Sequence, residues 1–570
     1  MGTKFNSDAD VDLDKPTIIE EECSEFIQHE LPSYTLKELL SIAERTLGTA
    51  ESTESQETTK VRHSLLQILA YLRCGERIRE ESGDQSSVVL ALASIIERVI
   101  APRVSLKPFK EGNAELPAAF DDDLKKALKQ RLEHCQAVSG PGLAVLEALA
   151  KHVNANGVPL GDDDVLLTLL AFTDESQEWT SPDTATTARA LLVHQFDINH
   201  NSLTKERFIG ETVLRQYLRP LFSKSKPPSV TASGRKAEYP DTDSRGGHGS
   251  NIPDDSPRTK PWKYTDLRAI TAAAWAVSEA DDQLVAKLWP LFTPVLLTLV
   301  DDSSTPVRRL GLLILADFLT KIPNHILHNN GLGKLFEDAV FPTLAYLPSL
   351  TPTDESIQLL VPAYTVLLRL ADKQPATTSH DGVRNGPKNR LLDKMLREGV
   401  FMAYFHAKEY ISIVEVLCQQ TALILNQMGI HAVKHLKDLI PMLSAIMADP
   451  FAPMGPATLL AAIQALQAVL ANCWPRIPAS PWQDEIINAL VLCWLHLPSH
   501  DSEKNSAPPA ATSQSLIEQE LLTCSKMLAA VLKTGNIDLA EHVAPVIEKE
   551  PALAGLFPGQ ESPSPPPSAV

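Results

Sequence analysis

The chain has 570 residues, 44% of them hydrophobic but only 6% aromatic, and Leu and Ala are abundant. This composition favours helix over sheet, and the length is enough for more than one hydrophobic core. The net charge of −19 argues against a protein that binds nucleic acid over its surface as a whole, so no nucleic-acid partner is expected.

The seven cysteines are scattered, at positions 23, 74, 135, 418, 473, 493 and 524, and no two of them form a CxxC pair. An odd number without such pairs is typical of a reduced intracellular chain rather than a disulfide scaffold. The N-terminus is polar and acidic, so no signal peptide is expected. The longest apolar runs contain Pro, Asp or Arg and are expected to fall short of a membrane span, so the sequence predicts no membrane partner.

The first half of the chain is predicted to be helical. Residues 1–15 are acidic and expected to be disordered, and residues 16–222 form a predicted N-terminal helical region. Polar helix starts support this, among them Thr35 and the acidic runs Asp121–Asp123 and Asp162–Asp164. The predicted helices are 17–30, 35–48, 60–81, 86–101, 121–137, 141–153, 163–172, 184–195 and 204–221, with a loop at 50–59.

Residues 223–262 interrupt this pattern. They are rich in Pro, Gly, Ser and Asp and have almost no apolar side chains, so they cannot offset the entropy lost on ordering. They carry seven Lys/Arg against five Asp/Glu, a weakly basic stretch in an acidic protein. We predict a disordered linker or insertion between two helical halves.

Residues 263–555 are predicted to form an all-α, HEAT/armadillo-like α-solenoid of stacked antiparallel helix pairs. In Leu284–Ile322 an acidic turn joins two helices, and Thr305 is the expected cap of the second, with Pro306 in its first turn. That helix is apolar on more than one face and must be covered on both sides. A second Thr-Pro start at Thr351 lies 46 residues after Thr305, a spacing typical of HEAT and armadillo repeats. An ordinary helical bundle is the alternative.

The remaining helices of this half follow one another closely. They are predicted at 264–279, 284–300, 306–321, 332–347, 354–372, 388–403, 407–428, 430–447, 455–473, 482–497 and 513–533, with a loop at 375–387. Residues 556–570 form a proline-rich tail that is expected to be disordered.

No constellation in the sequence predicts catalysis, a cofactor or a metal. His431 and His435 have the spacing of a zinc-protease pair, but Ala432 stands where that motif needs Glu. His325 and His328 lack an acidic or third ligand nearby. The acidic runs of the first half could be paired carboxylates, but helix N-termini explain them more simply. We therefore expect a protein that is not an enzyme.

Four residues are the predicted partner-binding site: Trp474, Arg476, Trp482 and Trp494. Pro475 must end the preceding helix, which places Trp474 and Arg476 at a corner, and the other two tryptophans flank the next helix. Trp and Arg at an exposed turn are typical of a protein-binding hot spot. Core packing is the alternative for each tryptophan.

Several stretches, in this order, resemble the Tel-two-interacting protein two family. They are GLGKLFEDAVFPTLAYLPSLTPTDESIQLLVPAYTVLLRL (331–370), LLDKMLREGVFMAYFHA (391–407), MGIHAVKHLKDLIPMLS (428–444), ADPFAP (448–453) and NCWPRIP (472–478). The resemblance is dense over about 262–500, thin over the N-terminal half, and looks like that of a fungal member.

The resemblance implies an α-solenoid subunit of the trimeric TTT complex. Its direct partners would be the other two subunits, above all a large HEAT-repeat subunit. With the ninety-kilodalton heat-shock chaperone, such a complex matures and stabilises phosphatidylinositol-3-kinase-related kinases, which implies a cytoplasmic and nuclear protein. The alternative is an armadillo-like transport or cargo adaptor. That class lines its groove with Trp and Asn ladders, and the tryptophans here do not recur at the repeat period.

Overall fold

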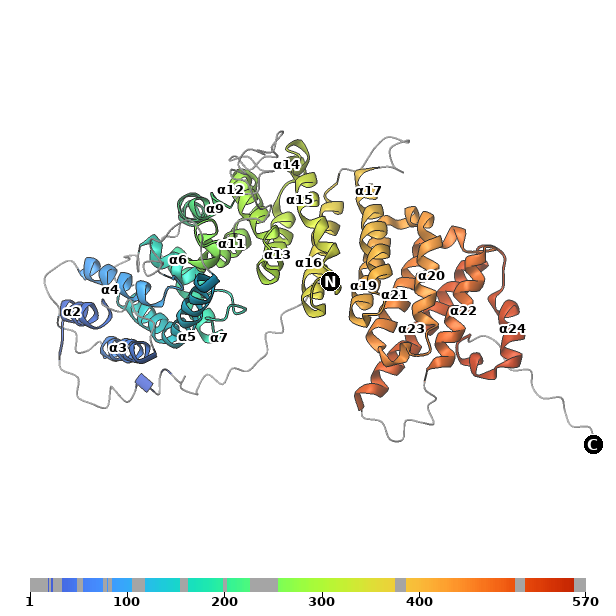
Figure 1. The fold of residues 1–570 in the computed structure, drawn as a ribbon, viewed down its shortest axis with the longest axis horizontal. Coiled ribbons are helices and arrows are strands. Elements are labelled where there is room, and N and C mark those ends of the chain that lie inside the picture. The colour runs from blue at the N-terminus through green and yellow to red at the C-terminus, as the bar shows by residue number, and fades with distance from the viewer. Residues whose placement is uncertain are drawn as a thin grey trace, which may run out of the picture. The chain divides into compact units, whose positions relative to one another are not determined.

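The computed structural model describes residues 33–48, 55–74, 85–104, 118–153, 162–197, 202–225, 255–374, 386–497 and 508–557, together with the single residues 19, 22, 23 and 79. Within these ranges the regular structure is helical, and one isolated antiparallel bridge joins Arg103 to Asp266. The chain divides into two compact units, Met1–Thr298 and Leu299–Val570 (Figure 1). This division differs from the one that we expected at 223–262.

The first unit contains helices from α2 to most of α12. Their bounds are α2 Leu36–Leu47, α3 Ser55–Arg73, α4 Gln85–Ile100, α5 Ala118–Val153, α6 Asp163–Ala171, α7 Pro182–Asp197, α8 Ser202–Arg207, the π-helix η4 Phe208–Leu218, α9 Arg219–Phe222, α10 Pro261–Tyr264, α11 Arg268–Glu279 and α12 Asp282–Val300. Thr35 caps α2 as predicted, because its hydroxyl accepts from Glu38 N while the Glu38 carboxylate accepts from Thr35 N. The side chain of Asp162 caps α6 in the same manner, by accepting from Val165 N.

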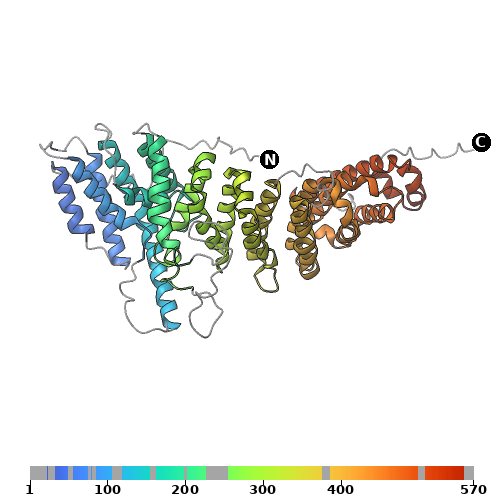
Figure 2. The same cartoon turned by 90° about the horizontal axis from the view of Figure 1, so that it is seen from above.

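Helix α5 is one continuous helix where we expected two, 121–137 and 141–153. It runs through Pro141 without a break and appears in Figure 2 as the long cyan helix. Pro141 has no N–H to donate to the carbonyl of Ala137, four residues earlier. Arg62 of α3 donates to that carbonyl instead, at 2.6 Å. A side chain from another helix thus satisfies the acceptor that proline leaves free, which the local sequence cannot show.

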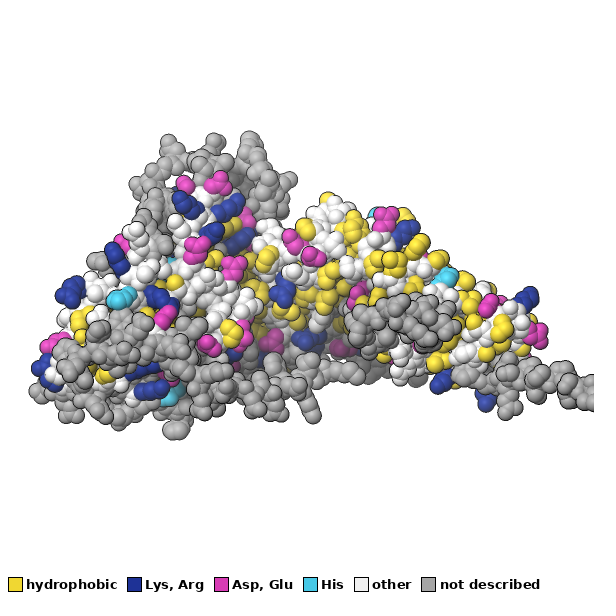
Figure 3. Space-filling view, turned by 90° about the horizontal axis from the view of Figure 1, so that it is seen from below, with side chains coloured by type: hydrophobic (Ala, Val, Ile, Leu, Met, Phe, Trp, Pro, Cys, Tyr) yellow, Lys and Arg dark blue, Asp and Glu magenta, His cyan; other side chains and the backbone are white. Residues whose placement is uncertain are grey.

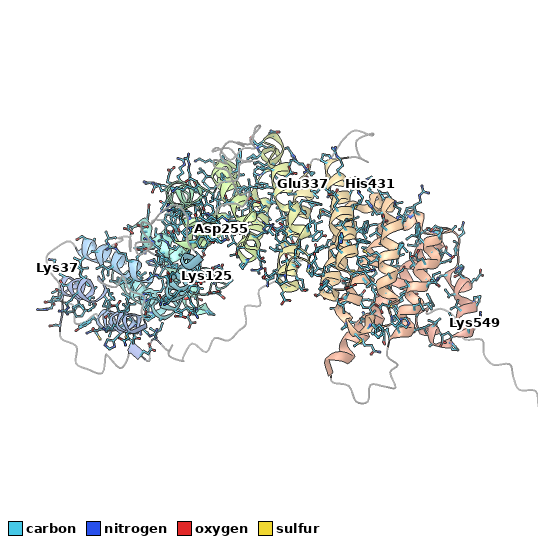
Figure 4. The ribbon with its side chains drawn as sticks, viewed as in Figure 1. Lys37, Lys125, Asp255, Glu337, His431 and Lys549 are labelled. Carbon is cyan, nitrogen blue, oxygen red and sulfur yellow. The ribbon has the colours of Figure 1, made fainter. Side chains whose placement is uncertain are left out.

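The ends of the predicted linker are ordered, contrary to our expectation for them. Trp262 is fully buried, stacks on Phe222 with ring centroids 4.9 Å apart, and donates to Ser225 Oγ at 2.9 Å. Asp255, labelled in Figure 4, accepts from Lys263 at 2.8 Å. The middle of the predicted linker, 226–254, lies outside the described residues, as do 1–15 and 558–570. Leu556 and Phe557, which we placed in the tail, are buried.

A buried ion cluster joins α4 and α6 to the start of α11. Arg268 is 2% exposed and contacts Glu97 at 3.3 Å, Asp266 at 2.8 Å and Thr168 Oγ1 at 2.9 Å. Arg103 also reaches Glu97, at 2.9 Å. Burial raises the pKa of Glu97, whereas Asp266 is also buried but its pKa is lowered because hydrogen bonds and charge from Arg268 outweigh the burial. Glu97 and Arg268 are 171 residues apart, so the cluster holds distant segments of this unit together.

The second unit contains helices α13 to α24. Their bounds are α13 Thr305–Lys321, α14 Asn324–Asn329, α15 Leu332–Val340, η5 Phe341–Ala345, α16 Thr353–Asp372, α17 Pro387–Lys394, the π-helix η6 Met395–Phe401, α18 Met402–Ala407, α19 Ile411–Met428, η7 Gly429–His435, α20 Leu436–Met447, η8 Ala452–Met454, α21 Pro456–Cys473, η9 Trp474–Arg476, α22 Pro481–His496, α23 Pro508–Lys533, α24 Leu539–Lys549 and η11 Pro551–Gly555. The sequence missed α14 and α24, and did not show that three predicted helices contain 3-10 or π turns.

These helices form the stack of antiparallel pairs that we predicted. Helices α13, α16, α19, α21 and α23 lie side by side as the second members of successive pairs (Figure 1). Side chains near their C-terminal ends join neighbours: Gln427 donates to Asp372 at 2.9 Å, and Asn472 donates to Asn426 at 3.0 Å. Because each contact joins equivalent ends, neighbouring second helices run parallel, as repeats of an α-solenoid do.

Helix α13 shows how tightly the stack is packed. Its buried residues lie on more than one face, as predicted, although Leu313 is exposed. A Cβ added at Gly311 would lie 2.7 Å from the backbone carbon of Leu299, so a larger residue would force the two segments apart. The predicted cap at Thr305 is wrong: the N-cap is Ser304, and no side chain makes the capping bond. Instead, Asp302 Oδ1 accepts from Ser304 N at 2.9 Å and orders the turn.

Two stretches are longer and more apolar than we expected. Helix α12 and residues Pro456–Arg476 are each long and apolar enough, by length and composition, to cross a membrane. The most apolar windows of the two are 67% and 61% buried inside the protein. Core helices of a stack have this character because neighbours cover them on several sides.

Candidate protein-binding surface

The predicted corner forms where helix α21 ends at Cys473. Pro475 cannot continue the α-helix, and Trp474–Arg476 make a short 3-10 turn. Trp474 is 46% exposed and Arg476 is exposed, so both side chains are accessible, as the corner prediction requires. We call these three residues the WPR corner.

The residues that follow hold the WPR corner in place. Ile477 is fully buried, and its carbonyl accepts from Ser480 Oγ at 2.7 Å. The buried side chain of Gln483 accepts from Ala479 N, and Ala479 has a φ of 55°, a region that residues other than glycine seldom adopt. The turn after α23 also packs here, because a Cβ at Gly535 would meet Pro478 at 2.5 Å. The WPR corner is therefore part of a fixed turn that exposes both an aromatic ring and a guanidinium.

The other two predicted residues lie on α22 and are partly buried. Trp494 Nε1 donates to Ala552 O at 3.0 Å, and its ring packs against Gly555, so it attaches the C-terminal η11 turn to the stack. Trp482 begins the same helix, and twelve residues of α-helix place it ~18 Å from Trp494. The structure thus brings Trp474 and Arg476 together but does not gather all four residues in one place.

A second exposed surface, which the sequence reasoning missed, lies where α19 and α21 begin. Phe405 is 72% exposed, Ile411 60%, Phe451 73% and Met454 81%, and Tyr410 is 40% exposed. We call these five residues the apolar edge. Tyr410 and Ile411 line a shallow hollow of about 520 Å³ at the starts of α19 and α21, and Gly455, the neighbour of Met454, also lines it. A signal was available: Phe451 and Met454 are large apolar residues in a Pro- and Gly-rich turn, where polar residues are the rule.

Two of the histidines that we considered, and two of the cysteines, have structural surroundings that explain them. His435 is buried and lies 2.8 Å from Asp393 Oδ1, and His328 lies 2.9 Å from Lys373 O. In the part of the chain that the structure describes, no group of three His, Cys, Asp or Glu residues could hold a metal ion. Burial raises the pKa of Cys473 and Cys493 to about 12, so both are neutral core thiols at physiological pH.

Two solved structures are similar to this chain over most of its length. The crystal structure of importin beta matches 93% of this chain at 11% identity with a TM-score of 0.35, and the chain spans 58% of the length of that importin beta chain. The crystal structure of SYS-1 also matches 93% of this chain, at 10% identity with a TM-score of 0.31, and 91% of SYS-1 is covered. No curated protein matches the chain.

A protein-family model also matches part of the chain. The model of the Tti2 family matches residues 165–454, from helix α6 to the end of η8, which is slightly more than half of the chain. The matched region includes all of the apolar edge and ends before the WPR corner. The resemblance seen in the sequence is thereby confirmed, and the chain belongs to the Tti2 family, a family of TTT-complex subunits.

Proposed function

We propose that this protein is a non-enzymatic scaffold subunit of a TTT-type complex. Together with the ninety-kilodalton heat-shock chaperone, the complex supports the maturation and stability of phosphatidylinositol-3-kinase-related kinases. The observation that carries the proposal is the Tti2 family match over residues 165–454. The architecture supports it, because an α-solenoid offers extended surfaces for large protein partners. Kinase clients and chaperone would be reached through the complex, in the cytoplasm and the nucleus.

Within this proposal, the C-terminal repeats at about 428–500 dock the large HEAT-repeat subunit. The WPR corner is the proposed centre of the contact. Trp and Arg are the residues that most often carry interface energy, and here both are exposed, two residues apart, on a turn fixed by Ile477 and Gln483. Trp482 lies at the start of the next helix and would extend the contact. Trp494 contributes through the packing of η11.

The test is affinity purification of the tagged full chain followed by mass spectrometry, combined with acute depletion of the chain from cells. We expect the other two TTT subunits in near-stoichiometric amounts, with chaperone and kinases at lower yield. After depletion, the amounts of several such kinases should fall while their messenger RNAs stay constant. Recovery of neither TTT subunit would overturn the proposal, and so would unchanged kinase levels after complete depletion.

One observation favours the armadillo-like transport or cargo adaptor as a second candidate. Asn426 and Asn472 hydrogen-bond at 3.0 Å from equivalent ends of α19 and α21, so asparagine occupies the same place in two successive helices, as an asparagine ladder would require. The tryptophans, however, do not recur beside these asparagines at the repeat period. The same purification separates the candidates, since an adaptor would recover transport cargo in place of TTT subunits.

A further inference from the structure

The two edges of the helix stack in the second unit have different chemistry. Helices α16, α19 and α21 run parallel, so their N-terminal ends lie at one edge and their C-terminal ends at the other. Hydrogen bonds between polar side chains join the C-terminal ends, whereas the apolar edge lies at the N-terminal ends of α19 and α21. Seen from below Figure 1, hydrophobic side chains gather over this side of the second unit (Figure 3).

The two turns that carry the apolar edge lie against each other. Ile411 O accepts from Thr458 Oγ1 at 3.2 Å, and a Cβ at Gly455 would lie 3.1 Å from Ile411 Cγ2. Polar residues at the exposed positions of the apolar edge would cost no packing. The chain nevertheless has phenylalanine, isoleucine and methionine there.

The size of this surface suits a short segment of a partner. Phe405, Phe451 and Met454 are more than 70% exposed and the other two side chains 40–60%, so the area is roughly 500 Å², the size of the largest apolar patch on a typical monomer, which is often functional. A standard protein interface takes ~800 Å² from each partner, so the apolar edge alone is too small to hold a second copy of this chain stably. The hollow between the two turns is large enough to take one bulky side chain.

The charges around the surface indicate what accompanies that side chain. Glu409 and Glu415 line the hollow, which has no Lys or Arg in its lining, and Asp449 stands on the neighbouring turn. Lys408 is exposed next to Glu409 and is the single Lys or Arg within 402–415 and 449–458. Three carboxylates against one amine give a net negative surface, which attracts basic ligands and repels acidic ones.

We propose that the apolar edge binds a short segment of a partner protein, in which an aromatic or long aliphatic side chain enters the hollow between α19 and α21 and adjacent Lys or Arg residues pair with Glu409, Glu415 and Asp449. This surface is distinct from the WPR corner, which lies at the opposite end of α21. The proposal does not depend on which complex the chain joins. It gives the protein two binding surfaces, one for a folded subunit and one for a linear segment.

The test uses the full chain and three labelled synthetic peptides in fluorescence anisotropy. The first peptide carries a Trp/Leu face and Lys residues, the second replaces Lys with Glu, and the third replaces Trp and Leu with Ser. We expect the first to bind at least about tenfold more tightly than the other two. The double variant Ile411→Ser/Met454→Ser should weaken that binding at least about tenfold, and Glu409→Lys/Asp449→Lys should weaken it most at low salt.

A matched control variant distinguishes specific binding at the apolar edge from non-specific hydrophobic binding. Leu423→Ser/Ile430→Ser removes two side chains of the same unit that are each 50% exposed, and it should leave binding unchanged. Equal binding of the basic and acidic peptides, no binding by any peptide, or full binding by the Ile411/Met454 variant would each overturn the proposal. It would equally be overturned if that variant instead abolished self-association of the chain or its binding to phosphatidylserine vesicles, since the occupant would then be a second copy or a membrane.

Discussion

Arg476→Glu tests whether the WPR corner binds a partner more cleanly than Trp474→Ala does, because the tryptophan also packs on the stack and the arginine is exposed. Trp474 is 46% exposed, so about half of its ~200–250 Å² is packed on the stack. At ~25 cal/mol per Å², Trp474→Ala should lower the free energy of unfolding by ~2–3 kcal/mol, whatever its role in binding. That loss corresponds to a fall in Tm of roughly 5–10 °C for a unit of this size. Arg476 is exposed, and Arg476→Glu should change stability by less than ~0.5 kcal/mol.

The assay is binding of the purified full chain to the large HEAT-repeat subunit by calorimetry, with Tm measured on the same samples. We expect Arg476→Glu to weaken binding by ~2–4 kcal/mol, which is about thirtyfold to several hundredfold, at unchanged Tm. Lys526→Glu, a charge reversal at an exposed position of α23 outside the proposed docking region, is the matched control and should bind normally. If Arg476→Glu binds as tightly as the unaltered chain, the WPR corner is not the docking surface.

Three further predictions concern stability and are measured by chemical denaturation of the full chain. Phe318 is fully buried and lies edge-on to Phe336 at 6.3 Å, so Phe318→Ala should cost ~3–5 kcal/mol, and a loss below ~1 kcal/mol would contradict its place in the core. Arg268→Ala leaves Glu97 and Asp266 buried with Arg103 as the remaining cation nearby, so we expect a loss of ~2–4 kcal/mol; a stable variant would show that the ion cluster is dispensable. Burial, assisted by the nearby charge of Arg131, lowers the pKa of His134 from 6.5 to about 4. The unfolded chain therefore binds a proton more readily than the folded chain, and stability present above pH 6.5 is lost as the pH falls toward 4, by ~2 kcal/mol at pH 5. His134→Gln should lack this part of the acid sensitivity, and an unchanged pH profile in that variant would contradict the assignment.

The sequence predicted the helical stack because the signal is repeated along many helices. A helix such as α13 must be covered on both sides if its apolar residues occupy several faces, and that reasoning needs no detail of its ends. Helix ends were harder to predict. Thr35 was correctly identified because Glu38 completes a reciprocal pair of bonds, whereas Ser304 took the place that we gave to Thr305 by a shift of one residue.

The errors arose where a distant residue decides the local structure. Pro141 ends no helix because Arg62, from another helix, donates to the carbonyl that Pro141 cannot reach. Trp262 is ordered because its ring stacks on Phe222 and donates a hydrogen bond to Ser225, although the residues before it look like a linker. Such contacts join positions far apart in the chain, and periodicity within one helix contains no information about them.

The two candidate surfaces differ in how far the sequence could identify them. Pro475 forces a turn wherever it stands, so the exposed position of Trp474 and Arg476 followed from local rules. The apolar edge arises because α19 and α21 run parallel and bring Ile411 beside Gly455, and that arrangement requires the stack itself. Trp494 looked like the other tryptophans in the sequence, yet its hydrogen bond to Ala552 gives it a structural role.

We propose that this member of the Tti2 family acts by binding other proteins in a TTT-type complex. Reconstitution tests this function: the purified full chain is mixed with the large HEAT-repeat subunit and analysed by size-exclusion chromatography with light scattering. We expect a single peak with the mass of a one-to-one complex, which Arg476→Glu shifts toward the separate proteins and Lys526→Glu leaves intact. Separate elution of the two unaltered proteins at micromolar concentration would contradict it.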